Sequence, residues 1–163
     1  MPQPSLSVEI DQIPLLAAIP VALRRLLVPT AHLLDFTPLS VVFREGAPAD
    51  ALYLVSTGSV ALEVHVPVRG NIRILTVGPG ELLGWSAVLG NATMTATARA
   101  LEPTRLIAFP AAQLRDACSA NHELGYHLMR QLASTLSSRL TATRLQLLDA
   151  FAESAPHLFA PLE

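Results

Sequence analysis

Apolar and polar residues alternate along the middle of the chain, from about His32 to Phe109. The period of two is clearest over 60–67, and it returns at 72–74, 94–99 and 105–109. Turn-forming residues separate these runs at Glu45-Gly46, Thr57-Gly58, Arg69-Gly70-Asn71 and Gly78-Pro79-Gly80. Short alternating runs broken by Gly and Pro are typical of antiparallel strands. The pattern predicts a mainly β fold, built as a sandwich or barrel.

Helical patterns flank this region on both sides. Pro20 is suited to the first turn of a helix over 21–27, and Pro29 ends that helix. After Pro110, the sequence predicts a short helix over 111–118 and then a long helix over 121–150. In the long helix, leucines recur every four residues, at Leu124, Leu128, Leu132, Leu136 and Leu140, and Leu147 continues the stripe. At ~1.5 Å per residue this helix is roughly 45 Å long, which is more than a small β domain needs.

Composition narrows the class of protein. The chain has 163 residues, of which 51% are hydrophobic and 15% charged, which argues against disorder. No apolar run reaches the roughly 20 residues of a membrane span, and the N-terminus has no signal-peptide pattern. A single cysteine, Cys118, excludes an internal disulfide and favours a cytoplasmic location. The net charge of -2 gives no basic surface for nucleic acid.

The sequence contains no recognisable catalytic pattern. It has no Gly-x-Ser-x-Gly elbow, and Gly78-Pro79-Gly80 is not followed by the Lys-Ser/Thr pair of a phosphate loop. His122 and His127 are five residues apart, which does not match the spacing of neighbours on a helix face. We therefore predict no catalytic residue, no metal site and no cofactor, and we expect that the protein is not an enzyme.

The stretch from Gly84 to Ala98 is the strongest candidate for a binding site. Gly84 precedes a predicted helical turn over 86–89, and the N–H groups at the start of such a turn point toward an anion. Gly46 and Gly58 lie between predicted strands, where a positive φ is often needed. Small residues dominate the rest of the stretch, which has the length of a phosphate-binding cassette.

Three segments, 43–60, 77–84 and 84–98, together resemble the cyclic nucleotide-binding domain of catabolite activators and kinase regulatory subunits. The resemblance covers about residues 10 to 150. It implies an antiparallel β-roll, which is a double-stranded β-helix of the jelly-roll type, followed by a short helix and a long C-terminal helix. The expected division is N-terminal helices over 1–30, the β-roll over 31–110, C-terminal helices over 111–150 and a tail over 151–163, with 1–150 forming one domain.

The cassette departs from the family pattern at its two charged positions. Trp85 stands where the resemblance implies a ribose-binding Glu, and Met94 stands where it implies a phosphate-binding Arg. Arg99 does not replace that Arg, because strand alternation turns it to the opposite face. On the long helix, the resemblance implies that Thr143 contacts the base; the alternative is a polar break in a helix–helix interface. The predicted ligand-binding residues are Gly84, Trp85, Ser86, Met94, Thr95, Ala96 and Thr143.

Three hypotheses for function follow. In the first, the chain is a regulatory module that senses an unidentified small ligand and does not bind cAMP or cGMP in the usual way. In the second, it is a ligand-free module for protein interaction or dimerisation. In the third, backbone donors and Thr95 retain some cyclic-nucleotide binding. The resemblance and the leucine stripe predict a homodimer through the helix over 121–150. We expect no DNA-binding domain in the dozen residues after that helix. Either the protein lacks such a domain, or this chain is a fragment or a stand-alone sensor, and a protein partner stays open.

Overall fold

The computed structural model describes residues 5–90 and 92–154. Residues up to His127 form one compact unit, and residues from Leu128 onward form a second. The long helix α6 (His122–Ser154) contributes to both units. It runs four residues past the predicted end at 150, so 151–154 are helical and do not belong to a tail. The rest of that predicted tail, 155–163, lies outside the described residues.

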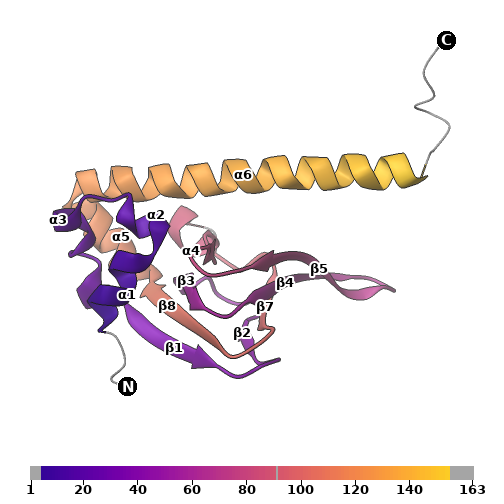
Figure 1. Ribbon diagram of the computed structural model, residues 1–163, viewed down its shortest axis with the longest axis horizontal. Helices are drawn as coiled ribbons and strands as arrows, with labels where there is room; N and C mark the ends of the chain where they lie inside the picture. Colours follow the sequence, from indigo (N-terminus) through magenta and orange to yellow (C-terminus); the bar gives the residue numbers. More distant parts are fainter. Residues whose placement is uncertain (1–4, 91, 155–163) are drawn as a thin grey trace, which may run out of the picture. The chain divides into compact units, whose positions relative to one another are not determined.

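Eight strands within the described residues form two antiparallel sheets of four (Figure 1). The first sheet has the order β1 (His32–Phe36), β8 (Thr104–Pro110), β3 (Ala51–Thr57) and β6 (Leu82–Leu83). The second has the order β2 (Val41–Phe43), β7 (Thr97–Ala100), β4 (Val60–Val66) and β5 (Gly70–Val77). Strands that neighbour each other in a sheet are often far apart in the sequence, as in a jelly roll. The predicted β-roll is confirmed.

The core of the β-roll includes positions that the period-two pattern marked, such as Val60, Leu62 and Leu106, and others that it did not mark, such as Val55, Val77 and Leu83. Side chains from both sheets form one buried cluster: Val55, Val60, Leu62, Val77, Leu83, Ala96, Ala98 and Leu106. Each large apolar side chain removed from water stabilises the fold by about 1.5–3 kcal/mol. The strand predicted from the alternation over 94–99 begins too early, because 94–96 are not in a strand and β7 begins only at Thr97. The chain there bonds instead to the turn over 46–49.

Short helices precede the first strand: α1 (Leu6–Gln12), α2 (Pro14–Ala17), α3 (Val21–Arg24) and the 3₁₀ turn η1 (Val28–Thr30). The predicted helix over 21–27 is therefore too long. Pro29 offers no N–H to Arg25 and crowds its carbonyl, so the chain tightens into 3₁₀-type turns after Arg24. Arg24 is buried and ties these helices together by donating to Asp11, Leu16 O and Ile19 O.

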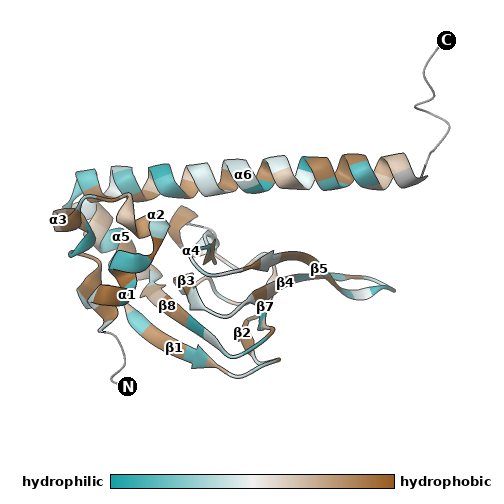
Figure 2. Ribbon diagram, viewed as in Figure 1, coloured by the Kyte–Doolittle hydropathy of each residue, from teal (hydrophilic) through white to brown (hydrophobic). Residues whose placement is uncertain are grey.

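Two helices follow the β-roll, α5 (Ala111–Ala120) and α6. Asn121 caps α6, because its side-chain oxygen accepts a hydrogen bond of 3.0 Å from the N–H of Leu124. Leu124 is buried, while large apolar residues near the other end of α6 are exposed. Those residues make the brown bands toward the C-terminal end of α6 in Figure 2. Among the described residues, no helix combines the length and the apolar composition needed to cross a bilayer.

Candidate functional site

Gly84 fixes the path of the chain into the cassette. Its φ of +78° lies in the left-handed region, where a Cβ is unfavourable. A Cβ at this position would also lie 2.9 Å from the Ala51 carbonyl oxygen, 3.2 Å from the Tyr53 ring and 3.4 Å from Met94 Cε. The close approach and the backbone conformation both require glycine here. The turn that the sequence predicted at Gly84 is confirmed.

The predicted helical turn is α4 (Ser86–Leu89), and Gly90 ends it with φ +81°. Its N–H groups are largely occupied inside the turn: Ala87 donates to the carbonyl of Gly84, and Val88 and Leu89 both donate to that of Trp85. The expectation that the N–H groups of this turn point at an anion therefore fails for these three donors. Ser86 is buried, with 2% of its surface exposed.

Met94 occupies the interior of the cassette, where the resemblance implied a phosphate-binding Arg. Its backbone is fixed on both sides, since its N–H donates to Ala47 O and its carbonyl accepts from the N–H of Gly46, both at 2.8 Å. Only 3% of Met94 is exposed, and its methyl group faces Gly84. Burial raises the pKa of the nearby Tyr53 phenol, and the charge of Asp50 raises it further. Met94 therefore fills this position with a buried, uncharged side chain.

What remains open beside Met94 is a cavity of about 70 Å³, hereafter the cassette cavity. Its lining residues are Phe43, Leu62, Ile74, Gly84, Trp85, Ser86, Met94, Thr95 and Ala96. Six of the seven predicted site residues are thus brought together. The seventh, Thr143, lies in the unit that begins at Leu128, where its hydroxyl donates to Arg139 O at 2.9 Å.

Sequence reasoning missed three lining residues, Phe43, Leu62 and Ile74. Alternation marked Leu62 as inward-facing but did not say which cavity it would face. Ile74 lies where the register of β4 against β5 shifts between Leu62 and Glu63, so it has no partner across the ladder. Such a bulge re-aims a side chain, and sequence alone gives no sign of it.

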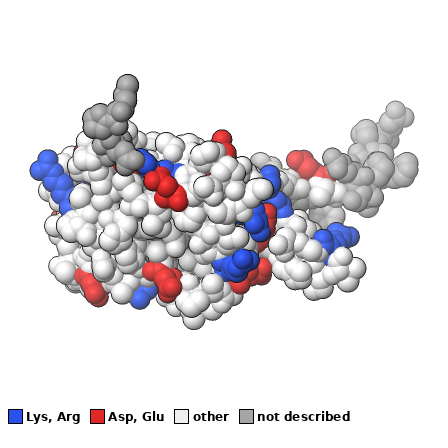
Figure 3. Space-filling model, turned by 90° about the horizontal axis from the view of Figure 1, so that it is seen from below, with Lys and Arg blue, Asp and Glu red and all other residues white. Residues whose placement is uncertain are grey.

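No Arg lines the cassette cavity among the described residues, and the chain contains no Lys. Arg99 bonds elsewhere, at 3.0 Å to Leu39 O and at 3.4 Å to Glu63. On the face drawn in Figure 3, the described charged side chains are scattered among uncharged ones. The cassette cavity is therefore an apolar site without a cation of its own.

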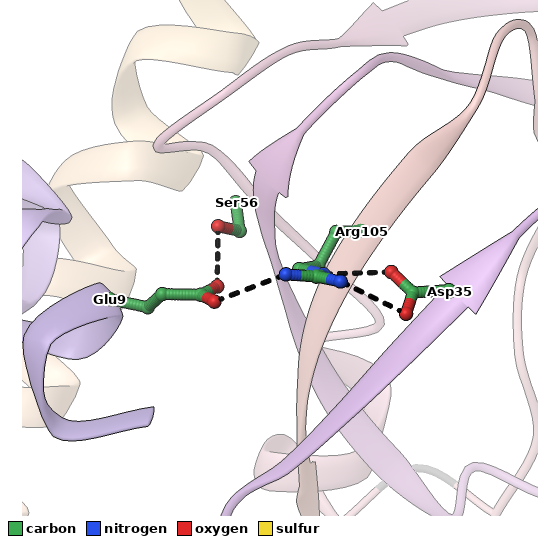
Figure 4. A network of polar contacts seen from close by, with 4 residues as sticks. All are labelled: Glu9, Asp35, Ser56 and Arg105. Carbon is green, nitrogen blue, oxygen red and sulfur yellow. Dashed lines mark hydrogen bonds and ion pairs between the residues drawn. The ribbon is translucent and has the colours of Figure 1, made fainter. Parts of the chain in front are cut away.

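A second cavity lies between α1, α2 and β3, with a volume of about 230 Å³; we call it the α1 cavity. Its lining residues are Glu9, Gln12, Ile13, Pro14, Ser56, Pro79 and Gly80. Glu9 is only 5% exposed. Its carboxylate accepts from the Ser56 hydroxyl at 2.8 Å and lies 3.5 Å from Arg105 Nη1 (Figure 4). None of these residues was predicted from the sequence, because Glu9 stands among other polar residues of α1, Ser7, Asp11 and Gln12, and nothing local marks it as buried.

The described residues hold no group of three His, Cys, Asp or Glu side chains close enough to bind a metal ion. His32 and His65 lie on β1 and β4, as expected from the alternation. Cys118 lies in α5 and is half-buried, and burial raises the pKa of its thiol. A raised pKa leaves little reactive thiolate near neutral pH.

Comparison with known families agrees with this architecture. The family described as "Cyclic nucleotide-binding domain" matches residues 33–121, which is more than half of the chain. The chain belongs to this family. The match spans the β-roll, α4 and α5, and it includes residues 84–86 and 94–96 of the cassette. The chain is therefore a regulatory domain of the cyclic nucleotide-binding type.

Similar proteins carry this domain in different settings. Glutaminase 2 of Bradyrhizobium diazoefficiens is 31% identical over 112 residues, covering 68% of this chain and 17% of that protein. The CRP-like cAMP-activated global transcriptional regulator of Mycobacterium tuberculosis is 29% identical over 123 residues, covering 75% of this chain and 53% of the regulator. This chain spans about half or less of these relatives. The solved N-terminal domain of a Streptomyces coelicolor transcriptional regulator is 28% identical, with a TM-score of 0.67, covering 82% of this chain and 94% of that domain.

Proposed function

We propose that this domain is a cytoplasmic regulatory module whose cassette senses a small, uncharged, mostly apolar ligand and does not bind cAMP or cGMP. The observation that carries this proposal is the apolar lining of the cassette cavity around the buried side chain of Met94. The family frame supports a sensing role, while the cavity's chemistry differs from that of a site for an anionic nucleotide.

Volume and charge both weigh against a nucleotide. The cassette cavity holds about 70 Å³, whereas pockets for drug-sized ligands hold roughly 300–1,000 Å³. Burying a phosphate without a cation or a full set of donors costs several kcal/mol. Thr95 and the remaining backbone donors offset only part of this cost, because charge-assisted hydrogen bonds are roughly twice as strong as neutral ones. Met94 is flexible, so a small apolar ligand can enlarge the cavity by moving it.

The direct test uses Trp85, the only tryptophan in the chain and a lining residue of the cassette cavity. We expect its fluorescence to stay flat when the protein is titrated with cAMP or cGMP up to millimolar concentration. A saturable change at micromolar nucleotide would contradict the proposal and favour residual binding through Thr95 and backbone donors.

A complementary test restores the missing charges. The double variant Trp85→Glu, Met94→Arg is expected to gain affinity for cAMP or cGMP in calorimetry, because the Gly84 turn and α4 are in place. Met94→Leu is the matched control, since it changes the side chain at the same position without adding charge. No gain at millimolar nucleotide would mean that the cassette frame no longer supports this chemistry.

A second candidate function rests on α6. Within the unit that begins at Leu128, large apolar side chains are more than half exposed: Leu140 (52%), Leu145 (57%), Leu147 (54%), Leu148 (61%) and Phe151 (66%). Covering such residues is worth about 1.5–3 kcal/mol each. In this alternative the domain needs no ligand and acts as a dimerisation module, with a second copy of α6 as the partner.

Sedimentation of the full chain tests the dimer. The wild-type protein is expected to be a dimer at micromolar concentration, and the double variant Leu147→Glu, Phe151→Glu a monomer, because the new carboxylates would be buried against the partner. Thr141→Glu adds a charge at an exposed polar position on the same helix and should leave the dimer intact. A monomeric wild-type protein would remove this candidate.

A further inference from the structure

The α1 cavity contains a buried carboxylate whose charge is only weakly balanced. Glu9 is 5% exposed, so its carboxylate has left water almost completely. Buried charges in proteins are normally paired, because an unpaired one costs several kcal/mol. The partners of Glu9 therefore decide whether the network around it is complete.

Arg105 is the one cation in this network, and its guanidinium is engaged mainly by another acid. It binds Asp35 with two hydrogen bonds, 2.7 Å from Nε to Oδ1 and 3.1 Å from Nη2 to Oδ2 (Figure 4). Its third contact, from Nη1 to Glu9 Oε1, is 3.5 Å long, at the outer limit of a hydrogen bond. Two carboxylates thus share one guanidinium, which gives the group a formal charge of -1, and Glu9 is its member that lines the cavity.

Glu9 also keeps unused acceptor capacity. An ionised carboxylate offers about four lone-pair sites, while Glu9 receives one good hydrogen bond, from the Ser56 hydroxyl at 2.8 Å, besides the long contact with Arg105. Both Glu9 and Ser56 line the α1 cavity. A positively charged N–H donor in that cavity would find a carboxylate and a hydroxyl oxygen side by side.

The remaining walls indicate what kind of cation fits. Ile13, Pro14, Pro79 and Gly80 supply apolar surface, and Pro14 packs 3.4 Å from where a Cβ of Gly80 would be. The volume of about 230 Å³ is ample for a small organic molecule, because a cavity needs only about 10–15 Å³ of such space to hold one water. Mg²⁺ and Ca²⁺ require several oxygen ligands, whereas this cavity offers one carboxylate. An organic cation with a short hydrocarbon part matches both the carboxylate and the apolar wall.

We propose that the α1 cavity binds a small organic ammonium ion, with its N–H groups donating to Glu9 and the hydroxyl of Ser56 and its hydrocarbon part against Ile13, Pro14 and Pro79. The site joins α1 to β3 and uses none of the residues that line the cassette cavity. It is therefore independent of the function proposed for the cassette, and either proposal can fail without the other.

The probe is n-butylammonium chloride, titrated into the 163-residue chain and followed by the ¹H–¹⁵N NMR signals of Ser56 and Gly80. Sodium chloride at equal ionic strength and neutral 1-butanol are the comparison titrants. We expect saturable shifts with butylammonium only. Glu9→Gln should weaken binding about tenfold or more, because it removes a charge-assisted hydrogen bond. Asp116→Asn removes the same charge from an exposed position on α5 and should leave the affinity unchanged.

Each of three results would overturn the proposal. The first is the absence of saturable shifts with butylammonium, which would mean a cavity filled by water. The second is an equal response to sodium chloride or 1-butanol. The third is a folded Glu9→Gln protein, with a dispersed NMR spectrum, that binds as tightly as the wild type. Should Glu9→Gln fail to fold, the comparison of titrants on the wild-type protein still decides the question.

Discussion

The cassette cavity and the α1 cavity differ in volume and in charge, and the cassette is the smaller and less polar of the two. The cassette, where an anionic ligand is expected, holds about 70 Å³ and is lined by apolar side chains around Met94. The α1 cavity, outside the cassette, holds about 230 Å³ and contains the buried carboxylate of Glu9. The larger space and the stronger charge thus lie away from the expected site.

The contrast teaches that the frame of a site and its chemistry are separable. The frame depends on backbone geometry, such as the positive φ of Gly84 and the short turn α4, and it is intact here. The chemistry depends on a few side chains, and Trp85 and Met94 stand where the resemblance implies Glu and Arg. Family membership shows the fold of the cassette, while its ligand is the subject of the proposal above.

The largest effect is expected from Met94→Ala. Met94 is 3% exposed and fills the cassette beside Gly84, so truncation should lower the free energy of unfolding by about 3 kcal/mol. It would also enlarge the cassette cavity and narrow the difference in volume between the two cavities. Urea denaturation measures the change. A loss below about 1 kcal/mol would mean that the site collapses and that Met94 is not a filler.

The second-largest effect is expected from Gly84→Ala, which should lower the free energy of unfolding by about 2 kcal/mol. A Cβ there adopts an unfavourable φ and lies 2.9 Å from the Ala51 carbonyl oxygen. Gly90→Ala is the matched control: its φ of +81° is similar, but no atom lies within 4 Å of the added Cβ. Its loss should be about 1 kcal/mol. Equal losses in the two variants, measured by thermal denaturation, would show that close packing at Gly84 contributes nothing.

For the α1 cavity, Ser56→Ala tests how much the buried carboxylate depends on its hydroxyl partner. Removing a donor to a buried charged group should cost about 1.5–2 kcal/mol of folding stability. Ser59→Ala removes the same kind of bond, 2.8 Å long, but to the exposed Glu102, so its cost should be about 0.5 kcal/mol. If chemical denaturation showed a larger loss of stability for Ser59→Ala than for Ser56→Ala, the carboxylate of Glu9 would not depend on the Ser56 hydroxyl.

The smallest effect concerns pH. The hydrogen bond from Arg105 is the main cause that lowers the pKa of Asp35 below the ordinary value of 3.8; burial opposes it, and the charge of Arg105 lowers the pKa further. A lowered pKa in the folded state means that the ion pair adds stability above pH 3.8, and that this stability is lost as the pH falls through the folded pKa. The free energies of unfolding of the wild-type protein and of Asp35→Asn should therefore differ near neutral pH and become equal in acid, as measured by urea denaturation at several pH values. If the difference in free energy of unfolding between the two proteins stayed constant over this pH range, the ion pair would not be its cause.

Much of the fold could be predicted from the sequence because its signals are local. Alternation over 60–67 fixes which side chains face inward, and Gly84 followed by small residues predicts the turn into α4. Six of the seven predicted site residues meet in one cavity for the same reason, since they lie within thirteen positions of one another along the chain. The helix predicted over 21–27 was too long because Pro29 acts back on the preceding turn through its missing N–H.

The sequence by itself determined the β-roll, the cassette frame and the absence of charge at Trp85 and Met94. Only the tertiary structure decided that Met94 fills the cassette and that Ile74 reaches it through a bulge. It alone also brought Glu9 to Ser56 and Arg105, which are 47 and 96 residues further along the chain. The physical reason is the range of the signals: periodicity and turn chemistry act between near neighbours, whereas volume and charge balance depend on which distant segments pack together.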